Sequence, residues 1–361
     1  MKKIHRAAEI FTGKNWLKDQ CIIVEDNIIT SIVPSTEIKE TAEDLHGKVV
    51  PAFIDIQLYG AYGKLFSVYP DTDALDKLRD YCFKGGAHFF MPTVATNTNE
   101  VIHACIDAVR VYWQKGGEGC LGLHVEGPWL NKAKRGAHIE AFIHSPTLEE
   151  VQALLEYGKD VIKIITIAPE VCSDEIIALI QSHNIVVSAG HSNATYKQAM
   201  AAFDKGIHAA THLFNAMSPL QHREPGLVGA IFNHPKVMSS IVPDGYHVDF
   251  AAVQIAKRQI QQRLFVITDA VTETTEGAYP HQLAGDKYES NGILSGSALD
   301  MAKALRNLVT YCNIELDEAL RMVSLYPAQV MGLDKSLGKI AVGHAAHFVC
   351  LNDKLEIIPR P

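Results

Sequence analysis

The sequence has few of the features that mark secreted, membrane or nucleic-acid-binding proteins. Its seven cysteines are scattered and form no Cys-x-x-Cys pair, so neither a disulfide framework nor a structural zinc knuckle is indicated. No apolar run approaches the length of a membrane span, and no signal-peptide segment follows the N-terminal Met1-Lys2-Lys3-Ile4. Basic residues are outnumbered by acidic ones, 33 to 41, and the net charge of −8 argues against a nucleic-acid surface. We therefore expect a cytoplasmic protein that binds neither nucleic acid nor a membrane.

The chain has enough apolar residues for a large core, with 47% hydrophobic content over 361 residues. Residues 1–48 show the pattern of short strands, and a similar pattern returns in residues 336–361. Two β segments at opposite ends of a chain can pair, so we expect them to form one small β-sandwich domain. Residues 49–335 then form the main domain.

Within residues 49–335, apolar runs alternate with amphipathic helical patterns at intervals near thirty residues, which is typical of βα repeats. The predicted strands are Val49–Leu58, His88–Ala95, Leu121–Glu126, Val161–Ala168, Ile185–Gly190, His208–Leu213, Val237–Val242 and Leu264–Thr268. Eight such units predict a closed (β/α)8 barrel of the TIM type, and an open doubly wound sheet is the alternative. Polar residues gather just after the strands, which favours the barrel.

Four side chains that can bind a metal or move a proton stand at or just after the ends of predicted strands. They are Glu126, His191, His212 and Asp269. Because strand ends meet at one mouth of a barrel, we expect these residues to face one another. Glu126, His191 and His212 give one oxygen and two nitrogen ligands and leave a position for water, as in hydrolytic zinc sites. Asp269 fits a general base, although its spacing also allows a fourth metal ligand.

Other polar residues have weaker signals. His138, in a Gly-containing loop, is suited to polarise a carbonyl, but an isolated loop histidine is more often exposed. His124 shares a strand face with Glu126 and is either a second ligand or, as we expect, a lower-layer barrel residue. Arg223 and His247 follow two strands and are suited to bind an anion or to remain solvated. The segment Gly292–Ser297 is a weak glycine-rich signal for a ligand contact.

Taken together, the motifs of this chain resemble one enzyme family over nearly the whole length. The motifs are Leu-His-Val-Glu-Gly-Pro-Trp at 123–129, Ala-Gly-His-Ser at 189–192, Thr-His-Leu-Phe-Asn-Ala-Met at 211–217, Arg-Glu-Pro-Gly at 223–226, Asp-Gly-Tyr-His-Val-Asp at 244–249, Thr-Asp-Ala at 268–270 and Leu-Ser-Gly-Ser at 294–297. This combination resembles the N-acetylglucosamine-6-phosphate deacetylases of the amidohydrolase superfamily. Pro-Ala-Phe-Ile-Asp at 51–55 and the split β domain fit the same family.

The resemblance implies specific roles for residues of this chain. Glu126, His191 and His212 would hold one divalent metal ion, Asp269 would be the acid and base, and His138 would assist at the acetamide carbonyl. The residues that match the family's substrate-binding positions are Ala137, His138, Asn215, Ala216, Arg223, His247, Leu294, Ser295 and Gly296. The family is usually dimeric. Arg223 or His247 would then bind the substrate phosphate in the pocket of the neighbouring subunit of a homodimer.

One departure from the family pattern concerns the first strand. Binuclear amidohydrolases carry His-x-His there, whereas this chain has Gln57-Leu58-Tyr59, and neither Gln nor Tyr is a good ligand for a divalent metal at neutral pH. We therefore predict a single metal ion. Zinc is expected, and Fe²⁺ or another divalent ion is the alternative. Mononuclear members commonly have Gln-x-Asn, so Gln57 fits that pattern and Tyr59 does not. The bulky phenol would narrow the pocket or alter substrate choice.

The resemblance predicts hydrolysis of N-acetylglucosamine 6-phosphate to glucosamine 6-phosphate and acetate. The nearest alternative is the same reaction on N-acetylgalactosamine 6-phosphate, because few pocket contacts decide between the two epimers. A cyclic-amide hydrolase or a base deaminase on the same barrel is a more distant possibility and would be indifferent to Arg223. A catalytically silent binding protein is disfavoured because Glu126, His191, His212 and Asp269 are all present.

Overall fold

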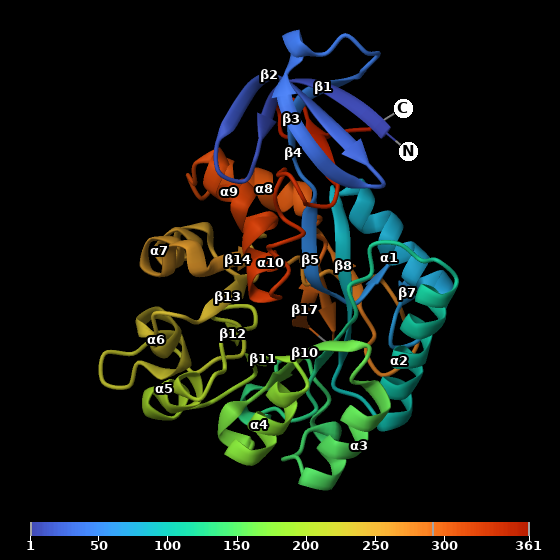
Figure 1. Ribbon diagram of the computed structural model, residues 1–361. Coiled ribbons are helices and arrows are strands. Elements are labelled where there is room, and N and C mark those ends of the chain that lie inside the picture. Colours follow the sequence, from blue (N-terminus) through green and yellow to red (C-terminus); the bar gives the residue numbers. More distant parts are fainter. Residues whose placement is uncertain (1, 291, 360–361) are drawn as a thin grey trace.

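The computed structural model describes residues 2–290 and 292–359 and consists of a barrel surrounded by helices, with a smaller sheet at one end (Figure 1). Residue 1 and residues 360–361, at the two ends of the predicted small β domain, lie outside the described residues. Within the described part of the chain, none of the helices combines the length and the apolarity needed to cross a bilayer. The described residues include all seven cysteines, and no disulfide joins any two of them.

Eight parallel strands form the barrel and follow one another in sequence order around it. They are β5 (Phe53–Leu58), β8 (Ala87–Ala95), β9 (Leu123–Glu126), β10 (Ile162–Ile167), β11 (Val186–Ala189), β12 (Ala209–Ala210), β13 (Met238–Ile241) and β14 (Leu264–Val266). The chain just beyond β14 closes the ring, because Tyr59 N–H donates to the Ala270 carbonyl at 2.8 Å and Asp269 N–H to the Gln57 carbonyl at 3.0 Å. The predicted barrel is therefore confirmed, and the open doubly wound sheet is excluded.

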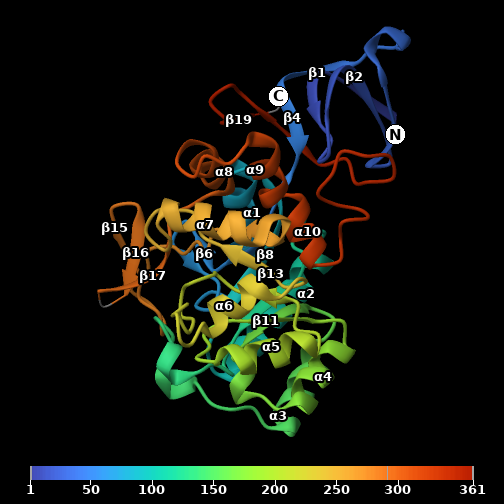
Figure 2. The same ribbon diagram turned by 90° about the vertical axis from the view of Figure 1, so that its left-hand side faces the viewer.

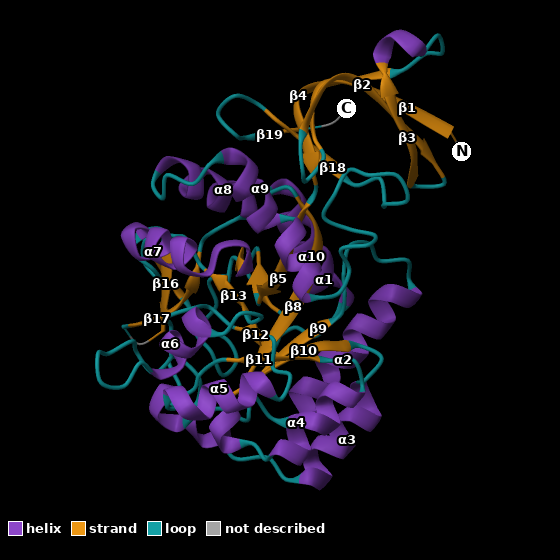
Figure 3. Ribbon diagram, turned by 60° about the vertical axis from the view of Figure 1, so that its left-hand side comes forward, coloured by secondary structure: helices purple, strands orange, loops and turns teal. Residues whose placement is uncertain are grey.

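The helices surround the barrel strands on the outside (Figure 3). They are α1 (Thr72–Lys84), α2 (Asn99–Gln114), α3 (Leu148–Gly158), α4 (Asp174–Ser182), α5 (Tyr196–Asp204), α6 (Gly226–Asn233), α7 (Phe250–Ile260), α8 (Met301–Thr310), α9 (Leu316–Val323) and α10 (Leu325–Val330). Short 3-10 turns cover Ser35–Glu37, Lys132–Lys134, Glu140–Phe142, Pro169–Val171 and Gln261–Arg263. Side-chain caps define several starts: Thr195 and Gln198 form a complete capping box at α5.

A six-stranded mixed sheet is built from both ends of the chain. Its strands are β1 (Lys2–Phe11), β2 (Trp16–Glu25), β3 (Ile28–Pro34), β4 (Glu43–Pro51), β18 (Phe348–Leu351) and β19 (Ile357–Ile358), in the order β19-β18-β4-β1-β2-β3. Its own apolar cluster includes Ile10, Ile22 and Phe348 and is separate from the main core. The C-terminal strands join the N-terminal ones through β18, which pairs antiparallel with β4.

The predicted first barrel strand, Val49–Leu58, is wrong as a single element. In the structure β4 ends at Pro51 and belongs to the mixed sheet, and β5 starts at Phe53 in the barrel. Ala52 between them donates its N–H to the His347 carbonyl at 3.1 Å. Because the residues on both sides of this junction are buried, the apolar pattern runs on without a break.

A small hairpin sheet that strand periodicity did not predict lies between β14 and α8. It consists of β15 (Gln282–Ala284), β16 (Lys287–Ser290) and β17 (Ile293–Ser297), and Figure 2 shows it beside the barrel, away from the mixed sheet. A shorter pair, β6 (Gly60–Ala61) and β7 (Lys64–Leu65), follows β5. Both additions stand at the carboxyl ends of barrel strands, where they contribute residues to a pocket.

Candidate metal centre

Of the four predicted strand-end residues, His191, His212 and Asp269 have a left-handed backbone conformation at the barrel mouth. Glu126 is the last residue of β9, and His191 and His212 each stand two residues beyond the ends of β11 and β12. The φ angles are +46° at His191, +38° at His212 and +55° at Asp269. This conformation costs a residue with a Cβ about 1 to 2 kcal/mol, so packing around the mouth must impose it. It turns the chain sharply at each strand end, where the side chains of these residues line the pocket.

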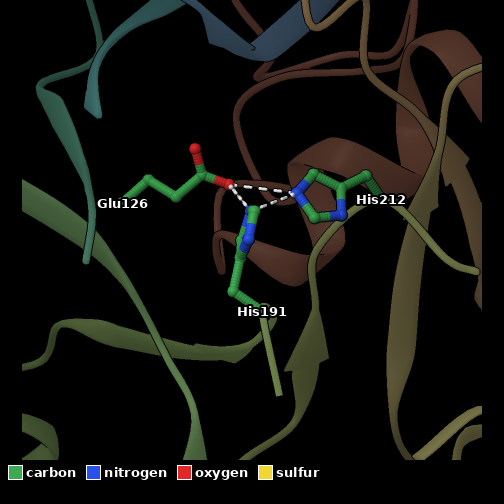
Figure 4. Close-up of side chains that lie close together, drawn as sticks. All are labelled: Glu126, His191 and His212. Carbon is green, nitrogen blue, oxygen red and sulfur yellow. Dashed lines mark hydrogen bonds and ion pairs between the residues drawn. The ribbon is translucent and has the colours of Figure 1, made fainter. Parts of the chain in front are cut away.

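Glu126, His191 and His212 bring one ligand atom each into a compact triangle (Figure 4). Glu126 Oε1 lies 3.2 Å from His191 Nε2 and 3.1 Å from His212 Nε2, and the two ring nitrogens are 3.1 Å apart. Two ligands of a tetrahedral zinc ion with bonds near 2.0 Å are about 3.3 Å apart. In the described part of the chain this is the group of His, Cys, Asp and Glu side chains whose spacing suits a metal ion.

The hydrogen bond that orients His191 also fits a cation. His191 Nδ1 faces the Lys134 carbonyl at 2.9 Å and must therefore donate, which leaves the Nε2 lone pair directed into the triangle. Burial lowers the pKa of His191 to about 4, so its ring is neutral at neutral pH. Lone pairs of His191 Nε2 and Glu126 Oε1 that point at each other need a positive charge between them. The donor set therefore fits a divalent metal ion.

Glu126 is the charged centre of the site and is only 1% exposed. Burial alone would raise its pKa, but the imidazoles of His138, His191 and His212 around the carboxylate outweigh burial and hold the pKa of Glu126 well below its usual range. His212 shows the reciprocal effect: burial lowers its pKa, and the bond to Glu126 more than offsets this, so the pKa of His212 is raised. Its Nδ1 is buried and has no hydrogen-bond partner among the described residues.

Asp269 lies beside the triangle but is not part of it. Its Oδ1 accepts from Gln57 Nε2 at 3.0 Å, and its Oδ2 is 3.6 Å from His247 Nε2. Burial raises the pKa of Asp269, which suits a group that takes up and returns a proton. His247 in turn is held by Asp244, whose Oδ2 lies 2.7 Å from His247 Nδ1.

His138 is buried rather than solvent-exposed. Its Nε2 lies 3.3 Å from Glu126 Oε2, and its Nδ1 lies 2.8 Å from Thr96 Oγ1. His124 is also buried, but it lies below the site, with Nε2 2.7 Å from Thr166 Oγ1. The structure thus places His138 at the pocket and His124 among the barrel's interior side chains.

The triangle stands in a pocket of about 840 Å³, measured with its open mouth, which is the size expected for a small-molecule site. Predicted residues that line it are Glu126, Ala137, His138, His191, His212, Asn215, Ala216, His247, Asp269, Leu294 and Ser295. Two predicted substrate-binding residues are not among the residues that line it. Arg223 is exposed, and Gly296 is buried behind the lining in β17.

Several lining residues were missed at the level of sequence. Tyr279 and His281 precede β15, and Leu65 and Ser67 stand in or just after β7. His281 Nδ1 lies 2.8 Å from Ser295 Oγ, and burial lowers the pKa of His281 to about 4, so it is a neutral hydrogen-bonding group. These residues come from turns and short strands, whose sequences have no periodicity to mark them. In this part of the pocket, only the glycine-rich segment that contains Ser295 was recognised from the sequence as a candidate ligand contact.

The comparisons with known proteins agree with this site. The model of the Amidohydrolase family matches residues 48–360. The chain is 35% identical to the N-acetylglucosamine-6-phosphate deacetylase of Haemophilus influenzae, over 97% of this chain and 95% of that protein. It is 31% identical to the N-acetylgalactosamine-6-phosphate deacetylase of Escherichia coli O157:H7, over 99% of this chain and 97% of that one.

A solved structure shows the same fold. It is a mutant N-acetylglucosamine-6-phosphate deacetylase from Mycobacterium smegmatis in complex with N-acetylglucosamine 6-phosphate. Its TM-score is 0.89 at 27% identity, with 99% of this chain and 96% of that one covered. The chain therefore belongs to the amidohydrolase family, in the group of the N-acetylglucosamine-6-phosphate deacetylases.

Proposed function

We propose that this protein hydrolyses the acetamide group of N-acetylglucosamine 6-phosphate and releases glucosamine 6-phosphate and acetate. The observation that carries the proposal is the buried triangle of Glu126, His191 and His212 with Asp269 beside it in one pocket. The relatives named above support the substrate class, because they act on, or bind, phosphorylated N-acetylhexosamines. A cytoplasmic location remains part of the proposal.

The residues of the pocket have complementary tasks in such a reaction. A divalent metal, which we propose to be zinc, would supply Lewis acidity that acidifies water and polarises the acetamide carbonyl. Asp269 takes the proton of the attacking water and returns it to the nitrogen, because an amide leaves only when its nitrogen is protonated. His138 faces the pocket beside Glu126 and is placed to stabilise the developing oxyanion. Gln57 and His247 flank the Asp269 carboxylate and orient it.

The C4 epimer, N-acetylgalactosamine 6-phosphate, is the second candidate substrate. The 31% identity to an N-acetylgalactosamine-6-phosphate deacetylase over nearly the full chain supports this sugar as a candidate substrate. The ring hydroxyls would contact lining residues of the hairpin segment, such as His281 and Ser295, rather than the metal-facing groups. A few such contacts are enough to discriminate between epimers, since one hydrogen bond contributes about 0.5 to 1.5 kcal/mol.

Acetate release tests the proposal directly. We expect zinc-dependent release from N-acetylglucosamine 6-phosphate, weaker release from the epimer, and little from unphosphorylated N-acetylglucosamine. Treatment with a chelator should abolish the reaction, and added zinc should restore it. Failure to release acetate from either phosphorylated sugar would contradict the function. Equal rates with and without the phosphate would instead point to another amide hydrolase of this family.

Arg223 leads to a prediction about subunit organisation. It is exposed and away from the lining of its own pocket, so we propose a homodimer in which it binds the substrate phosphate of the partner. Arg223→Ala should lower kcat/KM roughly 10- to 100-fold, the range for losing charge-assisted hydrogen bonds. Activity on an unphosphorylated acetamide should not change.

Mixed dimers provide the control. Co-expression of Arg223→Ala with Asp269→Asn should restore roughly a quarter of wild-type activity, because half of the dimers are mixed and each of these has one intact site. If Arg223 serves its own pocket, the mixture will show only the average of the two variants. A monomeric protein at working concentration would also contradict the shared site.

A further inference from the structure

Tyr59 is the departure from the family pattern, and the structure gives it a definite place. It follows β5 directly, and its backbone is held on both sides: its N–H donates to Ala270, and its carbonyl accepts from Phe66 N–H, both at 2.8 Å. The phenol lines the pocket and donates to Glu126 Oε2, while Gln57 Nε2 donates to the phenol oxygen at 2.8 Å. Tyr59 thus contacts the carboxylate proposed to bind the metal.

The two oxygens of Glu126 have different surroundings as a result. Oε1 faces the nitrogens of His191 and His212 and completes the triangle. Oε2 faces away from it, toward the Tyr59 hydroxyl and His138 Nε2. A carboxylate oxygen that accepts from a phenol and has an imidazole 3.3 Å away is poorly placed to bind a cation. Glu126 is therefore restricted to coordination through Oε1.

The phenol ring also occupies space on the β5 side of Glu126. At the end of this strand the chain has Gln57 and Tyr59. Gln57 donates to Glu126, to Asp269 and to Tyr59, so its amide links these groups rather than facing a free space. A second cation would meet amide N–H and phenol O–H groups at this place.

We propose that Tyr59 is a positioning residue, which holds Glu126 as a one-oxygen ligand of the metal. The inference rests on the proposed function only in that Glu126, His191 and His212 bind a metal. Outer-shell hydrogen bonds of this kind typically change metal affinity 10- to 100-fold. Tyr59 would act through Glu126 and would not touch the reacting atoms.

The test is the variant Tyr59→Phe, which keeps the ring and removes the hydroxyl. We expect wild type and variant to bind about one zinc per chain, with zinc affinity about 10- to 100-fold lower in the variant, measured by competition with a coloured chelator. Tyr157→Phe is the matched control, because the Tyr157 hydroxyl also donates to a carboxylate, Asp107 Oδ2 at 2.6 Å, but on the protein surface. The control should bind zinc as wild type does.

Thermal unfolding separates this role from an effect on folding. Metal-free Tyr59→Phe should unfold below metal-free wild type, because a buried hydrogen bond to Glu126 is lost, and zinc should raise the midpoint of the variant by a smaller increment than that of wild type. Zinc affinity of Tyr59→Phe within twofold of wild type would overturn the positioning role. An ultraviolet absorption band of a tyrosinate on addition of zinc to wild type would also overturn it, because Tyr59 would then be a metal ligand. A wild-type chain that binds no divalent metal would overturn the proposed function itself.

Discussion

Replacement of Asp269 by asparagine is expected to abolish turnover while the metal stays bound. The side chain lies outside the Glu126, His191 and His212 triangle, so its loss leaves those three ligands in place. An asparagine oxygen can still accept from Gln57 Nε2, now 3.0 Å from Oδ1, and the pocket should keep its shape. The amide cannot move a proton, and loss of general acid–base catalysis costs about 100- to 10,000-fold in kcat.

The decisive measurement pairs kcat with metal content. Unchanged zinc stoichiometry together with a kcat loss in that range would support the proton-transfer role. If kcat falls less than tenfold, Asp269 is not the acid and base. If the metal is lost together with activity, Asp269 is a ligand, the alternative that the sequence left open.

Loss of a ligand should give the opposite pattern, in which metal and activity disappear together. His212→Ala removes one corner of the triangle, leaving Glu126 Oε1 and His191 Nε2, which are 3.2 Å apart. Structural zinc sites bind with about 10 to 16 kcal/mol from four ligands, so one ligand contributes roughly 3 kcal/mol, or more than 100-fold in affinity. We expect chain purified without added zinc to contain no metal and to be inactive.

His46→Ala is the matched control, because His46 is an exposed histidine in β4, far from the barrel mouth in sequence and fold. It should keep its zinc and its activity. Zinc at a large excess should partly restore His212→Ala, since the two remaining ligands still face the same point. Full metal retention at stoichiometric zinc would exclude His212 as a ligand.

The barrel and the metal-facing residues could be predicted because strand ends of a (β/α)8 fold converge. Glu126, His191 and His212 are far apart in sequence, and only the repeat places them at one mouth. The prediction needed no accurate strand lengths: β12 is only Ala209–Ala210, shorter than the predicted His208–Leu213, yet His212 still stands just beyond it.

Features that depend on loops could not be predicted in this way. His138 lies in a segment without strand or long helix, and its burial depends on a long-range contact with Thr96. Tyr279 and His281 reach the pocket because of how the hairpin folds over it, which no local pattern records. The junction at Ala52 was missed for a different reason: apolar residues on both sides are buried in two different cores.

The hairpin segment has an evolutionary consequence. It adds His281, Leu294 and Ser295 to the pocket, yet Glu126, His191 and His212 all lie on other parts of the chain. Under the proposed function, the residues that would select the sugar stand on a different segment from those that would perform the hydrolysis, so one set can change while the other is kept. Relatives of comparable identity that act on different epimers are what such a modular division produces.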